Sequence, residues 1–282
     1  MSISSEQPIF HRTSNAGFQY HPETGDKIYN RVPQVTWDFW IVKLLAVTVG
    51  ETAADFLATT LGFGLNNTSL VMGALLIALL ALQFNQQRYI PWIYWTTVVL
   101  VSVVGTLITD NLIDNLGWSL MSTTVMFTAI LAAVFAVWYA VERTLSIHSI
   151  YTFRREAFYW AAILFTFALG TSAGDQAAEA VGLGYFGSGI MYAVIIGAIT
   201  AAFYGKKMNG ILAFWLAYII TRPMGASFGD LLSQPSENGG LALGTVITSF
   251  IFLVGIAATV FYMTRSRDGL EIVPATELAE RK

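Results

Sequence analysis

Long apolar stretches, separated by short polar connections, fill the middle of the chain. A helix needs about 20 predominantly apolar residues to cross the hydrocarbon core of a bilayer. Eight stretches qualify, and they cover residues 36–61, 67–86, 91–115, 119–141, 156–181, 186–204, 209–233 and 241–264. The pattern predicts an all-α, polytopic membrane protein with eight transmembrane helices. A membrane domain is expected over 35–265, between polar tails at 1–34 and 266–282 that are expected to have little structure.

The odd-numbered stretches share a pattern in which tryptophan, glycine and aspartate recur at fixed spacing. The four copies are Trp40–Gly50–Asp55, Trp95–Gly105–Asp110, Trp160–Gly170–Asp175 and Trp215–Gly225–Asp230. They indicate a two-helix unit repeated over about 35–88, 89–145, 155–207 and 208–265. Because a unit with an even number of helices keeps its orientation, the copies are predicted to be parallel, about an axis along the membrane normal. We expect the odd helices to surround that axis with the even helices outside, and a two-plus-two clustering is equally allowed.

The basic residues predict the orientation. Of the 15 Lys and Arg residues, 13 lie in the tails or in loops after even stretches. By the positive-inside rule, these loops and both termini are cytoplasmic. The aspartate ends of the odd helices then lie toward the outer face.

Composition agrees with a membrane protein and excludes several kinds of chemistry. Charged residues make up 12% of the chain and hydrophobic residues 55%, whereas soluble domains carry about 25% charged residues. The chain has no cysteine, so it has no disulfide and no thiolate metal site. The basic residues are scattered in short loops, which argues against nucleic-acid binding. We expect no bound cofactor. The sequence is compatible with a monomer and with a homo-oligomer.

Helical geometry places the marked residues on one face. With the repeat glycine at 0° and about 100° per residue, tryptophan falls at about 80°, the next residue after glycine at about 100° and aspartate at about 140°. The residue after glycine is Glu51, Thr106, Thr171 or, in the last copy, Ala226, which Ser227 follows. The sequence therefore predicts a polar stripe on apolar helices, from tryptophan near the cytoplasmic interface to aspartate in the outer half.

The stripe carries more carboxylates than cations. Glu51 and the four repeat aspartates give −5 if ionised, and Lys43 and Arg222 give +2, which leaves −3. Protons, a bound cation or both must balance this difference. Carboxylates and hydroxyls are hard oxygen ligands that suit Mg, Ca or Mn. The predicted substrate- or ion-binding residues are Glu51, Asp55, Thr106, Asp110, Thr171, Asp175, Ser227, Asp230, Lys43 and Arg222, with Asp55, Asp110, Asp175 and Asp230 as hypothetical metal ligands.

Other features of the repeat have alternative explanations. Lys43 lies near the cytoplasmic end and could extend to the interface, whereas the deeper Arg222 could pair with a carboxylate or meet an anionic substrate. The tryptophans are interpreted as an interfacial aromatic belt. The glycines are interpreted as sites of close helix packing, with a helix break that frees carbonyls for an ion as the alternative.

The pattern resembles a family of uncharacterised bacterial inner-membrane proteins built from a repeat of unknown function. The resemblance covers about residues 35–265 and is carried by pairs such as Tyr94-Trp95 with Gly105-Thr106 and Asp110. Copies one and four depart from it, with Glu51 and Ala226 in place of threonine. The resemblance implies a bacterial inner-membrane location and no established activity.

Two functional hypotheses follow. The first is a transporter of a small cation, which is expected to be divalent, with proton coupling as an option; the aspartates bind or relay the ion. A small metabolite is the substrate if Lys43 and Arg222 face the pathway. The second is a non-catalytic scaffold or sensor whose aspartates lock helices together. An enzyme is disfavoured, because no nucleophile–base pair, zinc motif or phosphate loop is found.

Overall fold

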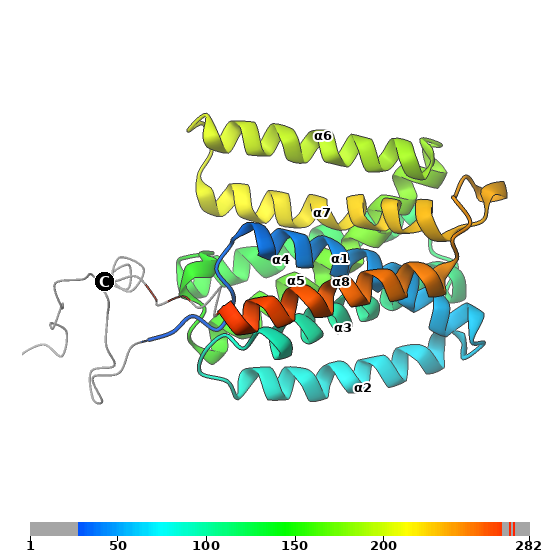
Figure 1. Ribbon diagram of the computed structural model, residues 1–282. Helices are drawn as coiled ribbons and strands as arrows, with labels where there is room; N and C mark the ends of the chain where they lie inside the picture. Colours follow the sequence, from blue (N-terminus) through cyan, green and yellow to red (C-terminus); the bar gives the residue numbers. More distant parts are fainter. Residues whose placement is uncertain (1–27, 267–270, 272, 274–282) are drawn as a thin grey trace, which may run out of the picture.

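A computed structural model describes residues 28–266 together with 271 and 273. Eight α-helices account for most of this part (Figure 1): α1 Trp37–Asp55, α2 Gly64–Phe84, α3 Pro91–Asp110, α4 Leu120–Glu142, α5 Phe153–Asp175, α6 Gly184–Tyr204, α7 Gly210–Ser233 and α8 Thr245–Ser266. Among the described residues, every one of these helices except α1 is long and apolar enough to cross a membrane, by length and composition. The helices confirm the expected all-α membrane class, and whether all eight span stays a prediction.

Polar residues begin several of the helices. The side chains of Thr36, Ser119, Thr152 and Asn209 each accept a hydrogen bond from a backbone N–H in the first turn of the helix that follows. Such caps satisfy N–H groups that have no partner within the helix. The α3 helix begins instead with Pro91, which needs no such partner.

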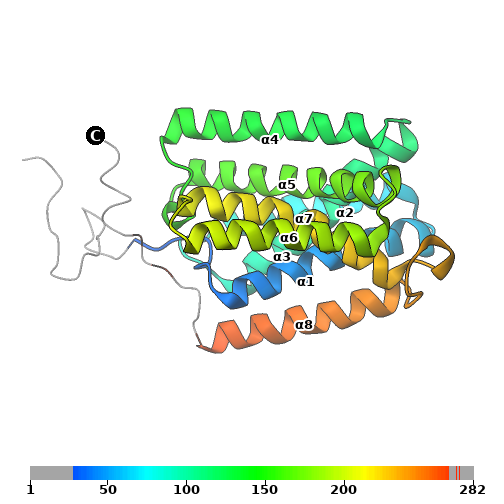
Figure 2. The same cartoon turned by 90° about the horizontal axis from the view of Figure 1, so that it is seen from above.

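The four odd helices form a closed ring. Extensive contacts join α1 to α3, α3 to α5, α5 to α7, and α7 back to α1. Each even helix packs outside on one member of the ring: α2 on α3, α4 on α5, α6 on α7 and α8 on α1 (Figures 1 and 2). The ring is the arrangement expected from the repeat, and the two-plus-two clustering is wrong. We call its two ends the Trp end and the Asp end, after the repeat residues found there.

Repeat glycines make the close contacts between neighbouring ring helices. A Cβ atom on Gly50 would lie 1.7 Å from Ser102 Oγ, and one on Gly105 would lie 2.7 Å from Phe167 Cβ. Gly170 has the same close contact with Arg222, and Gly225 has it with Val47. In all four cases the glycine packs against the residue that lies three positions before the repeat glycine of the neighbouring odd helix. The packing role of these glycines is confirmed, and the odd helices stay α-helical through all four positions.

The tryptophans do not form an interfacial belt. Trp95, Trp160 and Trp215 are only 1%, 3% and 4% exposed. Their rings pack between helices and their indole N–H groups have protein partners, as where Trp95 Nε1 donates to Tyr89 Oη at 2.9 Å. The expectation of a belt is wrong for these three residues, because they lie on the face that turns toward the ring.

The Asp end has a repeated local structure. In three copies the α-helix ends at the aspartate and continues as a five-residue π-helical segment: Phe56–Thr60, Asn111–Asn115 and Gln176–Ala180. A glycine with positive φ follows each segment, such as Gly62 at 70°. The fourth copy lacks the segment, and α7 runs on to Ser233. Widened turns of this kind are frequent at functional sites.

At the Trp end, residues outside the helices pack against the bundle. Arg31 Nη1 lies 2.8 Å from Glu156 Oε2 at the start of α5, and Gln83 Nε2 of α2 donates to the other oxygen of that carboxylate. Asn30 is fully buried and donates to the carbonyl of Ile147 at 2.8 Å. Residues 28–36 thus pack against the bundle, and the rest of the predicted N-terminal tail, 1–27, lies outside the described residues, as does most of the C-terminal tail.

Candidate functional site

One acidic cavity opens among the ring helices at their Asp end. Its volume is about 250 Å³. Seven carboxylates line it, namely Glu51, Asp55, Asp110, Asp114, Asp175, Glu179 and Asp230. The structure therefore brings all four repeat aspartates and Glu51 to one space. Asp114 and Glu179, which were not among the predicted site residues, join them from two of the π-helical segments.

The aspartates face the cavity with few contacts. Within the described residues, the side chains of Asp110, Asp175 and Asp230 form no hydrogen bond or ion pair with the protein, and that of Asp55 has one long contact, 3.5 Å from Gln234 Nε2. A carboxylate that locked two helices together would need a donor on the neighbouring helix. No three acidic, His or Cys side chains in this part of the chain lie close enough to hold a metal ion together. The cavity is accordingly a wide acidic chamber rather than a compact ligand shell.

A polar cluster drawn from all four ring helices adjoins this chamber through Glu51, which lines the cavity. Arg222 Nη1 on α7 lies 3.0 Å from Glu51 Oε2 on α1. Its Nη2 donates to Thr106 Oγ1 on α3 at 2.5 Å and to Thr171 Oγ1 on α5 at 2.8 Å. Arg222 is fully buried and Glu51 is 5% exposed. Of the two roles expected for Arg222, the structure supports the carboxylate pair.

Space for the guanidinium comes from the repeat itself. Gly170 has no side chain where the arginine passes, since a Cβ there would lie 2.1 Å from Arg222 Cγ. In the last copy the position after glycine holds Ala226, which offers no competing polar group. The arginine of α7 therefore occupies the place at which the other three helices present Glu51, Thr106 and Thr171.

Lys43 is buried below this cluster and does not extend to the interface. Its side chain is fully buried, and Nζ donates to the carbonyl of Tyr218 at 2.8 Å and to the hydroxyl of Thr221. The ammonium also lies 4.1 Å from the centre of the Tyr218 ring. The interfacial interpretation of Lys43 is wrong, because the side chain finds these partners on α7 within the ring.

Ser227, like Lys43, lies outside the chamber lining and the polar cluster. Its hydroxyl donates to the carbonyl of Pro223 and accepts from Ser188 on α6 at 3.0 Å. It lies one residue further round the helix than the position of Glu51, and this rotation turns it toward the outer helix.

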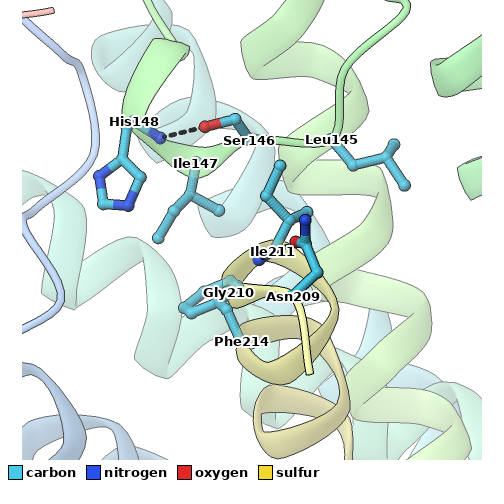
Figure 3. A pocket seen from close by; sticks show the side chains of 8 residues that line it. All are labelled: Leu145, Ser146, Ile147, His148, Asn209, Gly210, Ile211 and Phe214. Carbon is cyan, nitrogen blue, oxygen red and sulfur yellow. Dashed lines mark hydrogen bonds between the residues drawn. The ribbon is translucent and has the colours of Figure 1, made fainter. Parts of the chain in front are cut away.

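A second pocket, of about 290 Å³, lies at the Trp end. Figure 3 shows its walls, which come from the α4–α5 connection and the start of α7. Phe214, the aromatic residue before the last repeat tryptophan, lines it. The side chains of Lys43, Phe167, Tyr218 and Arg222 are fully buried. The second pocket is lined by loop residues and one ring helix, α7, whereas all four ring helices line the chamber.

The fold and the site define a helical membrane protein with four internal repeats and an acidic chamber on the repeat axis. The chain belongs to the family described as Repeat of Unknown Function (DUF347), whose profile matches residues 39–89, 93–144, 158–209 and 213–268. Each match covers one ring helix and the even helix that follows it. No curated protein and no solved structure matches the chain.

Proposed function

We propose that the chain is a membrane transporter of a small cation, which enters through the acidic chamber. One observation carries the proposal: the four repeat aspartates line one cavity together, and three of them have no protein partner within the described residues. Unpaired acidic side chains inside a membrane domain are costly and are usually functional. A cation in the chamber supplies the missing counter-charge.

The chemistry of the chamber favours a hard and at least partly hydrated cation. Carboxylate oxygens are the ligands that Mg²⁺, Mn²⁺ and Ca²⁺ prefer. Mg²⁺ in particular keeps several waters and is held through one or two carboxylates. A chamber of about 250 Å³, in which no three carboxylates converge among the described residues, fits an ion of this kind.

The buried layer next to the chamber supports alternating access. The chamber opens at the Asp end of the ring, and the fully buried side chains of Arg222, Lys43 and Tyr218 lie toward the Trp end. Parallel repeats around a shared site can rock against one another and expose the site to one side at a time. In this proposal the structure corresponds to a state in which the chamber is open.

The same proposal includes a topology. The protein lies in the bacterial inner membrane with all eight helices crossing it and both termini in the cytoplasm. Although α1 carries Asp38, Lys43, Glu51 and Asp55, it lies between α3 and α7 in the ring, where Lys43 and Glu51 are buried and Asp55 lines the chamber. The basic residues of the loops at the Trp end support a cytoplasmic position for that end, by the positive-inside rule.

We expect single cysteines at the two ends to be labelled from opposite sides. The chain has no native cysteine, so no background has to be removed. Thr59→Cys and Arg88→Cys both replace exposed residues, at the Asp end and the Trp end respectively. The reagent is a maleimide that passes the outer membrane but not the inner membrane. In intact cells it should label Thr59→Cys. It should label Arg88→Cys only after the inner membrane has been permeabilised. Labelling of both from the same side would contradict the topology.

We expect Asp110→Asn and Asp175→Asn each to slow cation uptake by roughly tenfold or more. Each change removes one negative charge from the chamber while keeping the size of the side chain, and tenfold corresponds to about 1.4 kcal/mol. The measurement is the initial rate of Mn²⁺ or Mg²⁺ uptake into proteoliposomes. Asp38→Asn, a change of the same kind outside the chamber lining, is the matched control and should keep the wild-type rate.

The competing hypothesis is a scaffold or sensor. The buried contact between Glu51 and Arg222 joins α1 to α7, as a structural lock would. In that case Asp110→Asn and Asp175→Asn lower thermal stability in detergent, added divalent cations leave it unchanged, and wild-type uptake does not exceed that of empty liposomes. A cation site instead predicts that divalent cations raise the melting temperature of the wild type more than that of either variant.

A further inference from the structure

We propose that Arg222 is a tethered substitute for the transported cation: its guanidinium occupies the central cation site when the site is empty, and an incoming cation displaces it. The inference rests on the proposed transport function and adds a mechanism for its central site. The substrate class that it implies is a small inorganic cation that prefers oxygen ligands.

The three partners of the guanidinium form a set of oxygen ligands. Glu51, Thr106 and Thr171 occupy the same repeat position on α1, α3 and α5, directly after the glycine. Their oxygens also approach one another, since Thr106 Oγ1 lies 3.4 Å from Glu51 Oε2 and 3.4 Å from Thr171 Oγ1. One carboxylate and two hydroxyls at this spacing are suitable ligands for a hard cation.

The arginine breaks the repeat, whereas its three partners all occupy one repeat position. The positions that match Arg222 in the other copies hold Val47, Ser102 and Phe167, none of which is charged. The guanidinium therefore reaches, from the fourth helix, a site that the other three helices build. Its Nε atom is buried without a hydrogen-bond partner in the described part of the chain. The contacts of this side chain are thus concentrated at the end that faces the ligand set.

One member of the ligand set is in contact with the acidic chamber. Glu51 lines the cavity with the four aspartates, so an ion that enters the chamber meets this carboxylate, behind which Thr106 and Thr171 are buried. On its other side the guanidinium lies 5.3 Å from the centre of the Phe167 ring, and Lys43 Nζ lies 5.8 Å from the same ring. Two cations in this buried layer form an electrostatic barrier to a further cation. While Arg222 is paired with Glu51, cations cannot leak through the transport pathway.

The proposal predicts competition between the arginine and the cation for the same oxygens. A tethered group acts at an effective concentration in the millimolar range or above, so its removal should tighten cation binding. We expect the Kd for Mn²⁺ to fall by roughly tenfold or more in Arg222→Gln, as measured by titration of purified protein in detergent. An unchanged or higher Kd would overturn the proposal, as would the absence of Mn²⁺ binding to both proteins.

Free guanidinium supplies a second, independent test. In Arg222→Ala, which leaves an empty space beside Glu51, low-millimolar guanidinium chloride should raise the melting temperature and compete with Mn²⁺, whereas the neutral analogue urea should do neither. Ser102→Ala, at the same repeat position on α3, should show no response to guanidinium, nor should Arg222→Ala combined with Glu51→Gln. If Arg222→Ala does not fold, the Kd of Arg222→Gln decides the question. Tighter binding in Arg222→Gln without uptake by wild-type proteoliposomes would support this inference and reject the transport function.

Discussion

Glu51→Gln is expected to destabilise the protein by about 3 kcal/mol and to lower its melting temperature in detergent. The change leaves the fully buried Arg222 guanidinium without its carboxylate. Removing one partner of a buried ion pair costs about 3–5 kcal/mol, because an uncompensated charge remains. The lower end of this range is expected, since the glutamine oxygen still accepts one hydrogen bond from the arginine.

A double variant separates this explanation from a simple packing defect. Glu51→Gln combined with Arg222→Gln removes both charges and should recover stability to within about 1 kcal/mol of the wild type, because no unpaired charge is left. Arg222→Gln alone should cost less than Glu51→Gln alone, since Glu51 faces the water-accessible chamber and the arginine does not. Glu237→Gln, in the loop at the Asp end, should have almost no effect. Equal losses in the double variant and in Glu51→Gln would contradict the ion-pair explanation.

Gly105→Val is expected to destabilise the protein by at least about 2 kcal/mol, since overpacking of a close contact typically costs 1–3 kcal/mol. A Cβ at this position would lie 2.7 Å from Phe167 Cβ and 3.1 Å from the backbone nitrogen of Ala168. Backbone atoms of α5 cannot rotate away as a flexible side chain can, so α3 and α5 must separate. The loss is measured as the change in melting temperature in detergent and is expected to lower cation uptake as well.

The even helices supply the matched control for this change. Gly197 on α6 has no atom within 4 Å of the position of an added Cβ. Gly197→Ala should therefore be neutral or slightly stabilising, because alanine is favoured over glycine within a helix. A comparable loss of stability from both variants would show that the ring contact at Gly105 is not the cause of the effect.

Much of the architecture could be predicted because the repeat encodes it. Each repeat glycine marks a ring contact, and the face that carries Asp110 and Asp175 is the one that turns to the shared chamber. Helical geometry was sufficient for this, since tryptophan, the residue after glycine and aspartate all lie within a narrow arc. The departure of the last copy at the Asp end was also visible in the sequence, where Pro235 and Gly239 replace the regular glycine.

The partners across helices could not be predicted from one helix at a time. Arg222 lies three residues before its glycine, at about 60° on the same face, and Lys43 lies seven before, at about 20°. Both positions therefore lie between the repeat glycine at 0° and the tryptophan at about 80°, and this signal could have placed Lys43 in the ring rather than at the interface. The pairing of Arg222 with Glu51 depends on which helices are neighbours, as does the contact of Ser227 with Ser188 on α6.

The central claim, that negative charge in the chamber binds the transported cation, is tested most directly by a charge series at Asp175. The measurement is the initial rate of Mn²⁺ uptake into proteoliposomes containing equal amounts of wild type, Asp175→Glu or Asp175→Asn. The account predicts that glutamate keeps a rate within about threefold of the wild type, whereas asparagine lowers it by roughly tenfold or more. Equal rates for the glutamate and asparagine variants, or wild-type uptake no faster than that of empty liposomes, would contradict it.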